Sequence, residues 1–93
     1  MFYIVELIIK CDEKVKEKLE AIIQQWASVE FEINKRPIYD GKKNPDIWNL
    51  WGIFEESEKN NAYSIPLIVD NNGGLPLDIW IKPTDDISYL FDD

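Results

Sequence analysis

Three segments with different apolar spacing at the start of the chain constrain its fold most strongly. Every second residue is apolar in 2–11, which predicts a strand. In 12–28 the apolar residues fall on one helical face, and Asp12 stands where an N-cap is expected. Alternation returns in 29–34 and predicts a second strand. The apolar positions are Tyr3, Val5, Leu7, Ile9 and Cys11, then Val15, Leu19, Ile22, Ile23 and Trp26, then Val29, Phe31 and Ile33.

The middle of the chain contains turn signals followed by a helix-start signal. Residues 35–44 include Arg36-Pro37 and Asp40-Gly41, which are typical of a turn-rich connector. Asn44-Pro45-Asp46 offers a capping side chain, a proline for the first helical position and an acid near the positive helix end. A helix over 45–59 is predicted, with Ile47, Leu50, Trp51 and Phe54 as its buried stripe. An alternating strand over 47–54 is the competing interpretation, because the segment is rich in Trp, Ile and Phe.

Two further alternating segments, 63–69 and 75–81, predict a hairpin around the turn residues 70–74. Pro66 removes a backbone donor, so the first of these strands is expected at a sheet edge or with that position unpaired. The tail, 83–93, is expected to dock on the core as one helical turn.

The predicted element order is β-α-β-α-β-β, and the predicted fold class is α+β. We expect a two-layer sandwich, with a four-stranded antiparallel or mixed sheet and two helices on one face. A ferredoxin-like arrangement is related, but its second helix lies between the third and fourth strands. With 93 residues the chain is expected to form a single domain, 1–93.

The charge is acidic and unevenly distributed. There are 18 acidic and 10 basic residues, which gives a net charge of −8. Residues 44–93 hold ten of the acids and only two lysines, so the whole excess lies in that half. A negative field repels nucleic acid phosphates and anionic lipid, and it attracts basic proteins. The competing interpretation is that the charge serves solubility alone.

The N-terminal apolar run, Met1–Ile9, is interrupted by Glu6 and lacks a positive region and a small-residue cleavage site. It predicts neither a signal peptide nor a membrane span. Cys11 is the only cysteine and cannot form an internal disulfide, which favours a reducing, cytoplasmic setting.

Residue types that carry catalysis are scarce. There is no histidine, and no P-loop, GxGxxG or nucleophile elbow. Cys11 lies in the apolar set of the first strand, which predicts a buried thiol. The segment 70–73 is similar to the start of a calcium loop, but its glycine comes at the fourth position instead of the sixth. The paired acids Glu55/Glu56 and Asp85/Asp86 are better read as a solvated acidic edge. We therefore expect no enzyme activity, no cofactor and no metal.

The tryptophans divide into two groups. Trp26 and Trp51 lie on the apolar faces of the predicted helices and are expected in the core. Trp80 shares its alternate set with Asp78 and Lys82, and Trp48 lies off the main stripe, so both are expected on less buried surfaces. An exposed tryptophan among carboxylates is typical of an interface anchor. The competing interpretation is that a helix or the tail covers both.

These features suggest an acidic inhibitor that binds and neutralises a basic protein. Its most concrete form is a bacterial immunity protein or antitoxin, which occludes the active or nucleic-acid-binding surface of a nuclease toxin. One alternative is a nucleic-acid mimic against a defence protein such as a CRISPR effector. Others are a structural or regulatory oligomer-forming subunit, and a small enzyme or ligand binder that uses Cys11 or clustered acids. The predicted partner-binding residues are Asp46, Trp48, Glu55, Glu56, Glu58, Asp78, Trp80, Asp85 and Asp86.

Overall fold

Four strands and two helices make up the computed structural model, which describes residues 1–36 and 46–90. Their order along the chain is β-α-β-β-α-β, with two short 3₁₀ turns in addition. The elements are β1 (Phe2–Lys10), α1 (Glu13–Ile23), β2 (Ser28–Lys35), β3 (Ile47–Glu55), the 3₁₀ turn Glu56–Glu58, α2 (Lys59–Asn71), β4 (Leu75–Thr84) and the 3₁₀ turn Ser88–Leu90.

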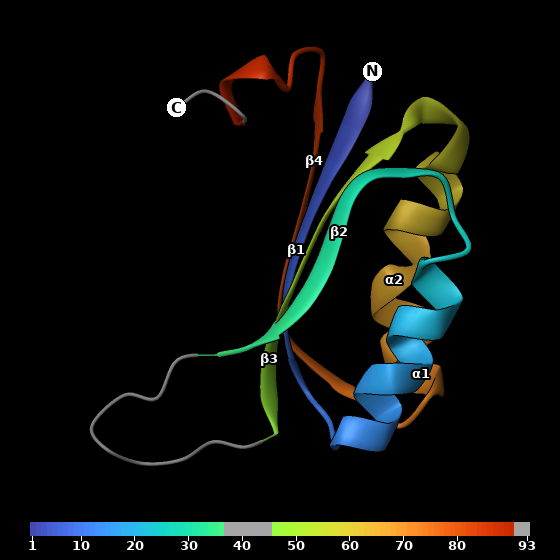
Figure 1. Cartoon of the computed structure of the whole chain (residues 1–93), viewed down its shortest axis with the longest axis vertical. Helices are drawn as coiled ribbons and strands as arrows, with labels where there is room; N and C mark the ends of the chain where they lie inside the picture. The colour runs from blue at the N-terminus through green and yellow to red at the C-terminus, as the bar shows by residue number, and fades with distance from the viewer. Residues whose placement is uncertain (37–45, 91–93) are drawn as a thin grey trace.

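The strands form one antiparallel sheet in the order β2-β3-β1-β4. Both helices lie on the same side of this sheet (Figure 1). The element order is that of the ferredoxin-like, or split β-α-β, topology. The α+β class and the antiparallel sheet are confirmed, but the predicted order β-α-β-α-β-β is wrong, because the second helix lies between β3 and β4.

The first half of the chain agrees with the prediction. β1, α1 and β2 occupy the predicted segments, although α1 ends at Ile23 rather than near residue 28. Asp12 is the N-cap of α1, and its carboxylate accepts a 2.8 Å hydrogen bond from the backbone N–H of Val15. Residues 37–45, which hold most of the predicted connector and the Asn44-Pro45 pair, lie outside the described residues.

The predicted helix over 45–59 is wrong, and the competing strand interpretation is correct. β3 pairs with β1 on one side and with β2 on the other. Trp48, Leu50 and Phe54 alternate along it and are buried. Backbone pairing on both sides, together with the high strand propensity of Trp, Ile and Phe, outweighs the helix-start signal that precedes this segment.

The predicted strand over 63–69 is also wrong, since this segment lies inside α2. Ala62, Ile65 and Val69 are buried at helical spacing, whereas Tyr63 and Leu67 are exposed. The apolar residues of this segment therefore fit both an alternating and a helical pattern. The contact of α2 with β1 and β4 selects the helix.

The predicted hairpin turn at 70–74 is instead the end of α2. Gly73 has a φ of 92°, and the backbone N–H of Gly74 donates a 2.9 Å hydrogen bond to the Val69 carbonyl. A Cβ on Gly74 would lie 2.8 Å from Val69 Cγ1. The glycines therefore allow a close turn from helix to strand, as they do at many helix C-termini. Pro66, predicted in a strand, lies within α2.

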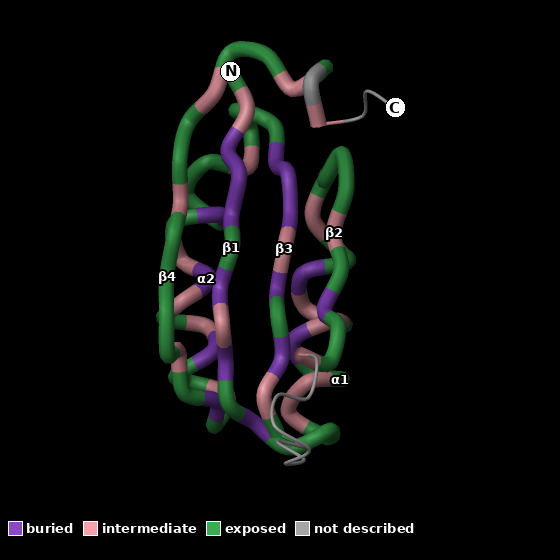
Figure 2. The backbone as a smooth tube through the Cα atoms, turned by 90° about the vertical axis from the view of Figure 1, so that its left-hand side faces the viewer, coloured by how far each residue is buried: buried purple, intermediate pink, exposed green. Residues whose placement is uncertain are grey.

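The core lies between the helices and the sheet. In Figure 2 the buried stretches are concentrated in β1 and β3, the two inner strands, with α2 behind β1 and β4. α1 and α2 contribute buried aliphatic side chains such as Leu19, Ile23 and Ile65. The tail includes the predicted helical turn, at Ser88–Leu90, and this turn lies on the side of the sheet away from the helices (Figure 1).

Candidate binding cleft

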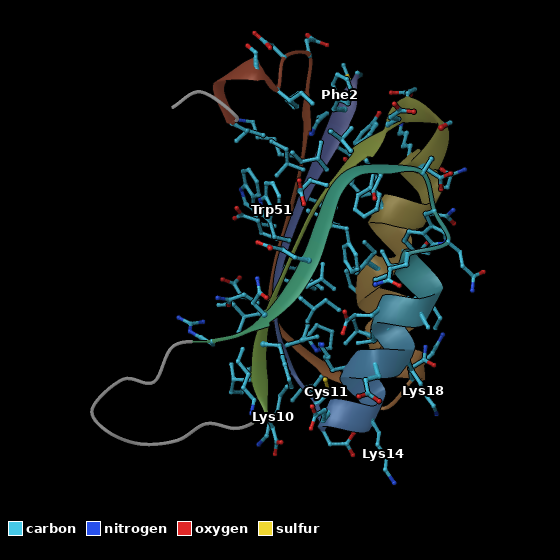
Figure 3. The ribbon with its side chains drawn as sticks, in the orientation of Figure 1. Phe2, Lys10, Cys11, Lys14, Lys18 and Trp51 are labelled. Carbon is cyan, nitrogen blue, oxygen red and sulfur yellow. The ribbon has the colours of Figure 1, made fainter. Side chains whose placement is uncertain are left out.

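Tryptophans and glutamates alternate across the sheet on the side that the helices leave uncovered, which we call the open face. In the strand register, Trp51 lies opposite both Glu32 and Glu6, and Glu6 lies opposite Trp80. The neighbours of Glu6 in β1 are buried against the helices, so Glu6 points away from them. Figure 3 shows Trp51 on this open side. We call the set Glu32, Trp51, Glu6 and Trp80 the Trp-Glu row.

A cleft of about 540 Å³ lies over this row. It includes the whole Trp-Glu row, and Asp78 and Arg36 also line it. Asn34 and Asn49, which are partners in the register, add their amide groups. The cleft therefore combines two aromatic rings, three carboxylates, the Arg36 guanidinium and neutral hydrogen-bonding groups.

The two tryptophans of the cleft differ in how far they are exposed. Trp80 is 45% exposed, whereas Trp51 is half-buried. Beside the row, Ile4 and Ile53 are register partners and are buried even though they point to the open face. The open face therefore has a buried apolar pair beside the cleft, whereas the Trp80 ring remains accessible to a ligand.

Sequence reasoning identified only part of this cleft. Asp78 and Trp80 were predicted as partner-binding residues, and the structure brings them together there. Glu6, Glu32 and Trp51 were missed. The interruption of the first apolar run by Glu6 was a usable signal, because alternation alone places this residue on the face opposite Val5 and Leu7.

The predicted roles of two tryptophans are exchanged. Trp48, expected on an outward surface, is only 5% exposed, and its indole N–H donates a 3.0 Å hydrogen bond to the Cys11 carbonyl. Trp51, expected in the core, lines the cleft. Both expectations were wrong because they assumed a helix where the chain forms β3. Trp26 is partly buried and packs against the core.

Five of the predicted acids lie at one end of the sheet, which we call the acidic end. Phe2 is in register with Glu55 on one side and with Thr84 on the other, so the segments that follow β3 and β4 flank the start of β1. All five members are exposed or half-buried. They are Glu55, Glu56, Glu58, Asp85 and Asp86.

Three of the acids at this end have hydrogen-bond partners within the chain. Glu56 accepts a 2.9 Å hydrogen bond from the Tyr3 hydroxyl, and burial together with this carboxylate raises the pKa of Tyr3. Glu58 accepts from the Asn61 amide. The backbone N–H of Ser88 donates to Asp86, and this hydrogen bond lowers the pKa of Asp86.

The remaining predicted acid, Asp46, does not belong to either group. It is exposed and precedes β3, whereas Glu55 ends that strand, so the length of β3 separates it from the acidic end. The predicted site residues therefore lie in the cleft, at the acidic end, at Asp46 and, for Trp48, in the core.

The Cys11 thiol is buried, as predicted, with 5% of the residue exposed. Burial raises its pKa, and the nearby Asp12 and Asp46 carboxylates raise it further. We expect native protein at neutral pH to react with iodoacetamide much more slowly than protein in denaturant, because the reagent needs an accessible thiolate. Mass spectrometry over time measures both rates. Equal rates in the two conditions would contradict this prediction.

The described residues offer no metal centre and no membrane span. Within 1–36 and 46–90, no three or more Cys, Asp or Glu side chains lie close enough to hold a metal ion together. In the same part of the chain, no helix is both long enough and apolar enough to cross a bilayer.

The chain matches no protein-family model, and neither a curated protein nor a solved structure is significantly similar to it. The fold and the cleft together define a structural class, an α+β protein of ferredoxin-like topology with a tryptophan-carboxylate cleft on its open sheet face. Fold alone does not imply function, so a functional proposal depends on the cleft.

Proposed function

We propose that this protein binds a basic protein through the open face and thereby neutralises it. The proposed biological form is a bacterial immunity protein or antitoxin, and the proposed partner is a nuclease toxin. The observation that carries the proposal is the Trp-Glu row in the cleft. Aromatic side chains supply contact area, and carboxylates supply the charge that a lysine- or arginine-rich surface requires.

The row suits a cationic side chain from the partner. Glu6 lies between Trp51 and Trp80, so an arginine that enters there meets a carboxylate at the centre and an indole on each side. Guanidinium pairs with carboxylate in charge-assisted hydrogen bonds and stacks on aromatic faces. A cation over an indole contributes about 0.5 to 2 kcal/mol, with the larger values where water is excluded.

The acidic end has a different role in this proposal. Its five carboxylates lie beyond the cleft and contribute to the long-range field of a chain with net charge −8. Such a field raises the association rate of a basic partner and falls with added salt. Once bound, the chain covers the cationic surface that the partner uses for nucleic acid. Inhibition then results from occlusion, without any catalytic step.

The nucleic-acid mimic is less well supported than the basic-protein inhibitor. A mimic requires carboxylates in rows that follow the spacing of phosphates along a strand. In the cleft, each carboxylate of the Trp-Glu row alternates with a tryptophan, and the other predicted acids gather at one end of the sheet. We also propose a cytoplasmic location, because the only cysteine is a free, buried thiol.

The proposal predicts capture of one basic protein from a lysate of the source organism at low salt, and much less capture at about 0.5 M salt. The captured protein is identified by mass spectrometry, purified and assayed for nuclease activity with and without this chain. We expect stoichiometric binding and inhibition, both weakened by Trp80→Ala.

The matched control for this experiment is Trp26→Phe, a conservative change of a tryptophan outside the cleft, which should bind like the wild type. Two outcomes would overturn the proposal. One is a captured partner that retains full activity when saturated with this chain. The other is capture that Trp80→Ala and Trp26→Phe affect equally.

A further inference from the structure

β4 is an edge strand with a long free side. It is the last strand in the order β2-β3-β1-β4, and within the described residues it pairs only with β1. Pro76 and Pro83 lie near its two ends. A proline in a sheet occupies positions where the missing N–H is not needed for the ladder, so Pro83 turns its nitrogen to the free side. By alternation, Ile79 and Ile81 turn their backbone N–H and C=O groups to the same side.

The surface around this edge is unusually apolar. Of the eight large apolar side chains that are exposed in the described part of the chain, six belong to α2 or β4. α2 packs against β4, so these six side chains lie on two neighbouring elements. They are Tyr63, Leu67, Leu75, Leu77, Ile79 and Trp80, with exposed fractions from 45% to 61%. An apolar edge of this kind, with unpaired backbone groups, is a template for another strand.

We infer that the occupant of this edge is a second copy of the same chain, whose β4 pairs antiparallel with the first β4 about a two-fold axis at Trp80. In this register Asp78 of each copy lies opposite Lys82 of the other. Both residues are exposed and, with Trp80, point to the open face. The pairing therefore forms two opposite-charge cross-strand pairs, which stabilise neighbouring strands.

The neighbouring registers lack this complementarity. Antiparallel partners on the free edge pair outward residues with outward residues, which an axis at any residue allows, and the axes nearest to Trp80 lie at Ile79 and Ile81. An axis at Ile79 would place Asp78 opposite Trp80, and an axis at Ile81 would place Trp80 opposite Lys82. Only the axis at Trp80 satisfies both charges. It also places Ile79 opposite Ile81, where the two residues exchange backbone hydrogen bonds.

The dimer joins the two sheets into one, with both α2 helices on the same side of the joined sheet. The contact between the copies covers apolar surface that is exposed in a single copy. The two Trp-Glu rows then meet at Trp80 and form one continuous row across both copies. The dimer does not rest on the proposed inhibitory function, because it is argued from the free backbone edge of β4 and the Asp78–Lys82 pairs, although Asp78 and Trp80 also line the cleft.

Charge reversal tests the register directly. We expect sedimentation velocity in about 0.15 M salt to show a wild-type dimer, and Asp78→Lys or Lys82→Asp alone to weaken it about tenfold or more, because each change converts two attractive pairs into two repulsive ones. The double variant Asp78→Lys/Lys82→Asp should recover the dimer. An equimolar mixture of the two single variants should form a heterodimer. Glu17→Lys and Lys18→Asp on α1 are the matched controls and should leave the dimer unchanged.

A cross-link provides a second readout of the same axis. Trp80→Cys places two thiols opposite each other across the axis, so mild oxidation should give a covalent dimer, whereas Trp51→Cys on the same face should not. The inference is overturned if the wild-type protein is monomeric at all concentrations up to its solubility limit. It is also overturned if a dimer forms but neither charge reversal weakens it.

Discussion

A Phe54→Ala variant is expected to lose about 3 to 5 kcal/mol of the free energy of unfolding, the usual cost of truncating a buried phenylalanine. Phe54 is fully buried in β3, and its ring lies 6.0 Å from that of Trp26 and 6.4 Å from that of Phe31, measured between centroids. The ring also covers Gly52, where a Cβ would come within 2.7 Å of Phe54 Cε2. Truncation leaves a cavity that none of these neighbours can fill.

Urea unfolding followed by circular dichroism measures this loss. A small domain has about 5 to 15 kcal/mol of stability, so Phe54→Ala should lower the unfolding midpoint substantially. Val29→Ala, at an exposed position in β2, is the control and should cost less than about 1 kcal/mol. Equal losses in the two variants would mean that Phe54 does not lie in a packed core.

The sequence alone was sufficient to predict an element where the apolar spacing of the segment favours one secondary structure, either strand or helix. In β1 one alternate set is apolar throughout and the other is interrupted by Glu6 and Lys10, and α1 has its apolar face together with the Asp12 cap. Both elements were therefore predicted correctly in type, although α1 ends earlier than predicted. The segment of β3 was predicted as a helix and part of α2 as a strand, because the apolar residues of each segment fit both the strand period and the helix period. In β3, Ile47, Leu50 and Phe54 fall at helical spacing by coincidence. Only the pairing of β3 with strands on both sides decides between the two, and this pairing depends on the whole fold.

The cleft was only partly predictable for a related reason. Alternation within a strand placed Trp80 and Asp78 on one face, and it also gives the face of Glu6. Alternation does not tell which strands are neighbours, so the meeting of Glu6 with Trp51 and Trp80 required the sheet order. The exchange of Trp48 and Trp51 likewise follows from the misassigned β3, because a strand and a helix send these two side chains to different sides.

Glu6→Lys is expected to weaken binding of the basic partner by about 30-fold or more, the effect of removing one member of a desolvated charge pair. Glu6 is the central carboxylate of the Trp-Glu row, with Trp51 and Trp80 on its two sides. A lysine there leaves the arriving cation without its anion and adds a like charge. Surface plasmon resonance should report the loss mainly as faster dissociation, because the pair forms only in the complex.

Glu17→Lys on α1 is the matched control for this variant, since it changes the net charge equally on the side of the sheet away from the cleft. Its effect should be confined to the association rate and should largely disappear at about 0.5 M salt, where surface charges are screened. The effect of Glu6→Lys should persist there, because cleft contacts are shielded from solvent. If the two variants instead lose affinity equally and recover together in salt, the partner responds to net charge alone and the Trp-Glu row is not its binding site.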